Sequence, residues 1–172
     1  SAENAYQFLR SRRSTRCFKK TPVEREKLVQ LLELARLAPS GGNSQGIAYL
    51  VIENCSLLNQ LTAATIDWLD EQSQQGFPAA KVYAQYVAMH REQGKDSILR
   101  DAPCLIVAHA AASFARGREN SLLSLAYAEL YAPALGLGSC WAGLLESAAF
   151  AGSPVLALLG LPADRQFTGA IM

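Results

Sequence analysis

Residues 11–18 read Ser-Arg-Arg-Ser-Thr-Arg-Cys-Phe, so three arginines and two hydroxyl side chains fall between Arg12 and Arg16. Arginine offers a planar, permanently charged fork of donors, and serine and threonine add short hydroxyl donors. This combination suits the binding of a phosphate group. On its own, such a run of charge is also typical of a solvated helix end. Two further stretches favour the phosphate interpretation.

The second stretch, residues 38–45, reads Ala-Pro-Ser-Gly-Gly-Asn-Ser-Gln. It is rich in Pro, Gly and Ser and lacks apolar periodicity, which predicts a loop. Its glycines let the backbone approach a ligand closely, and Asn43 and Gln45 offer both donors and acceptors. A plain turn between a helix and a strand is the alternative.

The third stretch, residues 136–143, reads Gly-Leu-Gly-Ser-Cys-Trp-Ala-Gly. We expect its second half to lay backbone N–H groups against a flat ring, with Gly143 permitting close approach. Arg12, Arg13 and Ser14 would then serve a phosphate, and Arg16 would stabilise a reduced, anionic ring by its charge. Together the three stretches predict one site for a flat, phosphorylated cofactor.

Composition sets limits on the class of protein. The chain has 172 residues, of which 50% are hydrophobic and 18% charged, and this suits a single domain over 1–172. So little charge leaves apolar surface uncovered, which favours a subunit interface. A net charge of +1, with no basic stripe beyond the arginine cluster, argues against nucleic acid as a partner.

The chain shows no signal-peptide core and no apolar run long enough to span a membrane, which favours a cytoplasmic protein. Its four cysteines form no CxxC pair, so neither a zinc nor an iron–sulfur site is predicted. Cys104 lies in an apolar run and is predicted to be a core residue. His90 and His109 lack a recognisable catalytic or metal-binding setting, so we expect ordinary structural roles for both.

Apolar periodicity predicts helices over 2–11, 23–37, 57–72, 79–91, 120–135 and 146–159, the last with a break at 152–154. Asn120 or Ser121 is expected to cap the fifth of these helices, which is apolar nearly all round and therefore central. Continuous apolar runs predict strands at 47–52 and 103–110. A third strand or extended segment is expected at 139–144, and a short final strand at 167–172. Residues 72–78 are expected to be a polar break.

Few strands joined through helices indicate an α+β fold. No glycine-rich turn follows the first strand, and no P-loop pattern occurs, so a Rossmann site is not expected.

The chain resembles the FMN-dependent nitroreductase family. The resemblance rests on Arg-Arg-Ser-Thr-Arg at 12–16, Ala-Pro-Ser-Gly-Gly-Asn-Ser-Gln at 38–45 and Ala-Pro-Ala-Leu-Gly-Leu-Gly-Ser-Cys-Trp-Ala-Gly at 132–143. The order and spacing of these motifs fit, and they cover most of the chain. With Arg-Asp-Ala-Pro at 100–103, the chain is most similar to the branch in which a ferredoxin-like iron–sulfur segment often precedes this domain. Residues 1–172 hold no such cysteine cluster.

The resemblance implies an interlocked homodimer, with a central mixed β-sheet surrounded by helices and two FMN sites at the interface. The phosphate and the pyrimidine edge would contact Arg12, Arg13, Ser14 and Arg16. The partner subunit would bring the second stretch to the ring, through Pro39, Ser40, Gly41 and Asn43, and we add Gln45 for its polar groups. The segment passing the flavin N5 would be Cys140, Trp141, Ala142, Gly143 and Leu144. No side-chain general acid or base is implied.

The implied activity is ping-pong electron transfer. A reduced nicotinamide or a ferredoxin would reduce FMN, and a nitroaromatic, quinone or similar small molecule would then accept the electrons. A flavin-binding or flavin-sequestering protein without turnover is the alternative, because it needs the same residues to bind the flavin and its phosphate. A helical interaction domain without a cofactor would leave the arginine cluster and the glycine-rich loop unexplained. Family members usually continue past the last strand with Gly-Tyr-Pro and a basic tail that completes the phosphate grip, and residues 1–172 do not include one.

Overall fold

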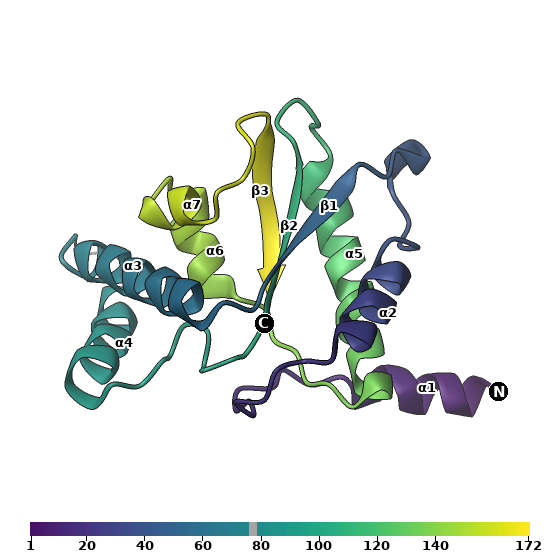
Figure 1. Ribbon diagram of the computed structural model, residues 1–172, viewed down its shortest axis with the longest axis horizontal. Helices are drawn as coiled ribbons and strands as arrows, with labels where there is room; N and C mark the ends of the chain where they lie inside the picture. The colour runs from purple at the N-terminus through teal and green to yellow at the C-terminus, as the bar shows by residue number, and fades with distance from the viewer. Residues whose placement is uncertain (76–78) are drawn as a thin grey trace.

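The computed structural model describes residues 1–75 and 79–172. Three strands form a small central sheet in the order β1-β2-β3, with helices on both faces (Figure 1). The strands are β1 (Ile47–Ile52), β2 (Leu105–Ala111) and β3 (Arg165–Ile171). The predicted α+β class is confirmed.

The expectation of a mixed sheet is wrong for these three strands, which pair only antiparallel. The end of β1 pairs with the start of β2, Ile52 opposite Leu105, because the helical connection returns the chain to the strand end that it left. The last residue of β2, Ala111, likewise pairs with Arg165 at the start of β3. Among the described residues, the parallel pairing is an isolated bridge between Ser14 and Ser139.

Each predicted helix is present, with shifted ends. The helices are α1 (Ala2–Ser11), α2 (Arg25–Ala35), α3 (Cys55–Ser73), α4 (Ala80–Gln93), α5 (Gly117–Tyr131), α6 (Gly143–Phe150) and α7 (Pro154–Leu158). Two 3-10 turns, η1 (Gly41–Asn43) and η2 (Ala132–Leu135), lie in the second stretch and after α5. The polar break was expected at 72–78, but α3 continues to Ser73, so the break begins later. Residues 76–78 of the expected break lie outside the described residues.

Two local predictions need correction. Neither Asn120 nor Ser121 caps α5: the helix begins at Gly117, and both side chains are buried inside it. The segment predicted to be a strand or extended over 139–144 forms bridges only at Ser139 and Trp141, because Gly143 begins α6.

The core consists of two apolar clusters, one on each face of the sheet. Alternate residues of β2 serve both: Leu105 and Val107 face the cluster beneath α3 and α6, while Ile106 and Ala108 face the cluster under α2 and α5. Cys104 is buried in the second cluster, as predicted, and burial raises the pKa of its thiol to about 12.

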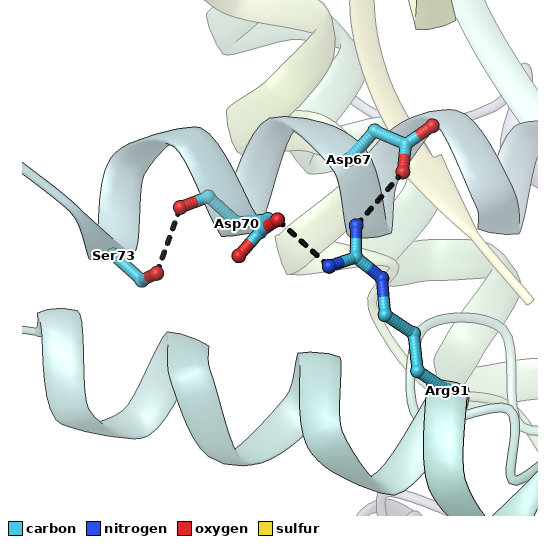
Figure 2. A network of polar contacts seen from close by, with 4 residues as sticks. All are labelled: Asp67, Asp70, Ser73 and Arg91. Atoms are coloured by element: carbon cyan, nitrogen blue, oxygen red, sulfur yellow. Dashed lines mark hydrogen bonds and ion pairs between the residues drawn. The ribbon is translucent and has the colours of Figure 1, made fainter.

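Helices α3 and α4 form a hairpin on the side of the sheet opposite α1, α2 and α5 (Figure 1). Arg91 on α4 donates to Asp70 at 2.8 Å and to Asp67 at 3.3 Å, and both carboxylates belong to α3 (Figure 2). Exposed ion pairs of this kind contribute little to stability. The tilted contact of Trp68 with Tyr83, with ring centroids 6.1 Å apart, adds apolar packing between the two helices.

The described part of the chain holds neither a membrane-spanning helix nor a metal-binding cluster. No helix there has the length and apolar character needed to cross a bilayer. Residues 1–75 and 79–172 also hold no cluster of three His, Cys, Asp or Glu side chains suited to a metal ion.

Candidate functional site

The first and third stretches lie against each other. The backbone N–H of Thr15 donates to the carbonyl oxygen of Ser139 at 2.8 Å, beside the bridge between Ser14 and Ser139. A Cβ atom at Gly138 would lie only 2.5 Å from Thr15 Oγ1. A glycine is therefore required at position 138 for the two stretches to approach this closely.

Two of the three arginines of the first stretch, Arg13 and Arg16, are held by backbone carbonyl groups. Arg13 donates to the carbonyl oxygens of Arg10 at 2.7 Å and Arg12 at 3.1 Å, and Arg16 lies 3.5 Å from that of Ser14. Arg13 and Arg16 are exposed, and Arg12 is half-buried. Within residues 1–75 and 79–172, none of the three lies within ion-pair distance of a carboxylate. The charge of Arg12 acts on the buried Glu129, whereas the charges of Arg13 and Arg16 are available to an anion.

The third stretch runs along the end of β3, and this changes which of its groups are available. Cys140 N–H donates to the Met172 carbonyl at 2.9 Å, and Ala142 N–H donates to the Ala170 carbonyl at 3.0 Å. Both side chains are buried. The expectation that the backbone N–H groups of this segment face a ring is therefore wrong for Cys140 and Ala142.

Other groups of the same segment remain accessible. Gly143 and Leu144 occupy the first turn of α6, where helix geometry leaves backbone N–H groups without an intrahelical acceptor. Gly143 is exposed, and Trp141 and Leu144 are half-buried.

The second stretch is a tight loop closed by its own side chains. Ser40 Oγ accepts from the N–H of Gln45 at 2.9 Å. Asn43 and Gln45 both have left-handed backbones, with φ of 54° and 51°. Left-handed geometry is uncommon outside glycine, so this loop needs support from its surroundings.

Asn120 on α5 gives that support, although its place in the sequence had predicted a helix cap. Its Oδ1 accepts from the N–H of Gly41 at 3.2 Å, and its Nδ2 donates to Ser44 Oγ at 3.2 Å and lies 3.5 Å from the Gln45 carbonyl oxygen. The signal that could have revealed it is an amide in the first turns of a helix expected to be central, since a buried amide needs partners.

Glu129 near the other end of α5 is a second residue that the sequence analysis missed. It is 4% exposed, and its Oε1 accepts from Ser139 Oγ at 3.2 Å. The Trp141 side chain also hydrogen-bonds to this carboxylate. Burial raises the pKa of Glu129, while the hydrogen bonds from Ser139 and Trp141 and the positive charge of Arg12 act in the opposite direction.

Within one chain, the three stretches do not all meet. The second stretch packs at the N-terminal end of α5 and the other two at its C-terminal end (Figure 1). Helix α5 has 15 residues, and a helix of that length spans about 22 Å. A single site containing all three stretches would therefore need residues from a second subunit.

Two clefts lie beside the three stretches. A cleft of about 450 Å³ lies beside the second stretch, between α2, β1 and α5, and its lining includes Leu32, Arg36, Pro39, Ser40 and Tyr49. A second cleft, of about 380 Å³, lies beside the first and third stretches, and its lining includes Thr15, Cys17, Lys19, Lys27 and Gly136. Both clefts combine apolar walls with polar groups, as ligand sites commonly do.

The sequence model of the nitroreductase family matches residues 9–172. The chain belongs to the nitroreductase family. Among curated relatives, the iodotyrosine deiodinase of Thermotoga neapolitana is 28% identical over 136 residues, which are 78% of this chain and 70% of that protein. The family resemblance is thus confirmed.

Solved structures give the same fold. A nitroreductase with bound FMN from Desulfitobacterium hafniense DCB-2 is 23% identical, with a TM-score of 0.78 over 97% of this chain and 86% of that one. A nitroreductase with bound FMN from Bacteroides fragilis NCTC 9343 is 20% identical, with a TM-score of 0.75 over 96% and 84% of the two chains. These nitroreductase-family likenesses confirm the predicted fold.

Proposed function

We propose that this nitroreductase-family chain is an FMN-dependent oxidoreductase that works as a homodimer, with FMN bound where two subunits meet. The observation that carries the proposal is the contact between Thr15 and Ser139. It brings three arginines without carboxylate ion-pair partners in the described chain to the segment that begins α6. Two solved structures with the same fold contain FMN.

The first stretch fits a phosphate. Arg12, Arg13 and Arg16 offer forked, charged donors, and the carbonyl bonds of Arg13 orient its guanidinium before a ligand arrives. Ser14 adds a hydroxyl donor. Such pre-organisation lowers the entropy cost of binding.

The flavin ring fits beside the start of α6. Trp141, Gly143 and Leu144 are the accessible members of the third stretch, and a Cβ atom added at Gly143 would meet no neighbouring side chain within 4 Å. Cys140 and Ala142 would support this edge from beneath, since both are buried. Arg16 would stabilise negative charge on the reduced ring.

A second copy would supply the second stretch. Pro39, Ser40, Gly41, Asn43 and Gln45 lie at the far end of α5 in their own chain, so they would reach the ring of the partner. The surface supports such an assembly. Four apolar side chains of α2 and α5 are between 36% and 45% exposed: Val29, Leu122, Leu123 and Tyr127. Helix α1 buries none of its own residues and exposes Tyr6, Phe8 and Leu9, and exposed apolar patches of this kind mark interaction surfaces.

Bound FMN would supply the redox chemistry, in a ping-pong cycle whose donor is a reduced nicotinamide or a ferredoxin and whose acceptor is a nitroaromatic, a quinone or a similar small molecule. The chain itself would bind the phosphate, orient the ring and limit access of water. We propose that this takes place in the cytoplasm.

The proposal is tested by the visible absorption spectrum of the purified protein, followed by release and identification of any chromophore. We expect about one FMN per chain, and oxidation of NADH or NADPH that depends on an added nitroaromatic or quinone. A protein that is colourless and does not take up added FMN would contradict the proposal. A protein that binds FMN but passes electrons to no acceptor would instead favour the flavin-sequestering alternative.

A halogenated phenol is a second candidate acceptor, because a curated relative at 28% identity is an iodotyrosine deiodinase. Replacement of a carbon–iodine bond by carbon–hydrogen takes two electrons and one proton and releases iodide. Iodide release from 3-iodo-L-tyrosine, with dithionite as the electron source, would support this acceptor. No release under conditions that reduce a nitroaromatic would exclude it.

A further inference from the structure

We propose that Glu129 is a positioning residue of the flavin site, whose carboxylate holds the arginine stretch and the ring-facing stretch in fixed relation to each other. This inference rests on the proposed function, since it assigns the first stretch to the phosphate and the third to the ring.

Glu129 contacts the third stretch directly and reaches the first stretch through Ser139, whose carbonyl oxygen accepts from the Thr15 N–H. Its Oε1 accepts from Ser139 Oγ at 3.2 Å, and the side chain of Trp141 also hydrogen-bonds to it. The positive charge of Arg12 acts on the same carboxylate. One buried carboxylate therefore fixes Ser139, the residue at which the two stretches meet, and its charge also acts on Arg12.

The position of Glu129 is unfavourable unless it has such a role. The side chain lies in the last turn of α5, where the helix dipole disfavours negative charge. It is also 4% exposed, and burial of a carboxylate costs free energy unless charges and hydrogen bonds compensate. Leucine or methionine at this position would satisfy the helix and the core alone.

The carboxylate acts in two separable ways. Its oxygens accept hydrogen bonds from the third stretch, and its negative charge attracts the Arg12 guanidinium. Glutamine keeps an acceptor oxygen but removes the charge, whereas alanine removes both. Glu129→Gln should therefore disturb the phosphate grip selectively, and Glu129→Ala should disturb the phosphate grip and the ring edge together.

The experiment compares the dissociation constants of FMN and riboflavin, which differ only in the phosphate. We expect Glu129→Gln to weaken FMN binding about tenfold while riboflavin binding changes less than about twofold, because the charge-assisted contact of Arg12 is lost. Adding Arg12→Ala to Glu129→Gln should then weaken FMN binding little further, since coupled residues are not additive. Glu71→Gln, the same change at an exposed position of α3, is the matched control and should alter neither constant.

A second readout needs no flavin. The chain has two tryptophans, so a Trp68→Phe background reports the fluorescence of Trp141 alone. Because Trp141 hydrogen-bonds to the carboxylate, Glu129→Ala should shift its emission maximum in the flavin-free protein, whereas Glu129→Gln, which keeps an acceptor oxygen, and Glu71→Gln should not. If Glu129→Gln fails to fold, Ser139→Ala takes its place, and weaker FMN binding is expected because the contact that fixes the third stretch to the carboxylate is lost.

Several outcomes would overturn the inference. Equal loss of FMN and riboflavin in Glu129→Gln would show a purely structural residue, and unchanged or tighter FMN binding would show that the carboxylate does not position Arg12. Fully additive effects of Arg12→Ala and Glu129→Gln, or an unshifted Trp141 emission in Glu129→Ala, would also overturn it. Failure of the wild-type protein to bind either flavin is a different result, because it would contradict the proposed function itself.

Discussion

The backbone N–H of Thr15 donates a 2.8 Å hydrogen bond to the carbonyl oxygen of Ser139, and this contact joins two segments far apart in the sequence. Gly138 makes it possible by leaving room for the Thr15 side chain. The contact defines one end of the proposed site, while Asn120 anchors the loop that a second copy would supply for the other.

The arginines are expected to bind the cofactor without stabilising the fold. Changing Arg16 to Ala, or both Arg12 and Arg13 to Ala, should weaken FMN binding by about tenfold or more, because charge-assisted hydrogen bonds to the phosphate or ring are lost. The far-ultraviolet circular dichroism should stay unchanged. Stoichiometric FMN in these variants would place the cofactor elsewhere. Lys81→Ala, at an exposed position of α4, is the control for loss of a surface cation.

Gly138 is expected to tolerate no side chain. In Gly138→Ala, a methyl group 2.5 Å from Thr15 Oγ1 would force the first and third stretches apart. We expect a loss of about 1–3 kcal/mol in the free energy of unfolding, together with weaker flavin binding. Urea denaturation measures the stability change. Gly143→Ala is the matched control for stability, since its added methyl would meet no neighbouring side chain within 4 Å, and equal stability of the two variants would refute the steric argument.

Asn120 is expected to support the second stretch from within α5. Asn120→Ala would leave the N–H of Gly41 without its side-chain acceptor, at a cost of about 1–3 kcal/mol in the free energy of unfolding. We expect faster amide hydrogen exchange at Gly41 and weaker flavin binding in the dimer. Asn59→Ala, at an exposed position of α3, serves as control. An unchanged rate of amide hydrogen exchange at Gly41 would show that the loop keeps its conformation without the Asn120 side chain.

The Cys104 thiol is expected to stay unreactive in the folded protein. Its raised pKa should lower the free energy of unfolding as pH rises above 9. Burial raises the pKa of its thiol from 9.0 to about 12. The folded state therefore holds this proton more tightly than the unfolded state does, so the contribution to stability is full below pH 9 and is lost as pH rises towards 12. Cys104→Ala should show a shallower decline of unfolding free energy over that range, measured by denaturant titration at each pH.

The same burial predicts a pattern of thiol labelling. Cys17 and Cys55 are exposed and should react with a thiol reagent at pH 8 in the native protein. Cys104 and Cys140 are buried and should react only after unfolding. Rapid labelling of Cys104 in the native state would show that its side of the core opens readily.

Sequence alone determined the features that depend on neighbouring residues. The apolar spacing of 23–37 predicted α2, the continuous apolar run at 103–110 predicted β2, and the three motifs identified the family, because local pattern and local chemistry suffice for each. The tertiary structure decided what depends on distant partners. A polar residue in a helical pattern, such as Asn120 or Glu129, reveals its role only when the helix packs and a buried group must find hydrogen bonds. The N–H groups of Cys140 and Ala142 likewise bond to β3, and that pairing arises only when segments distant in sequence fold together.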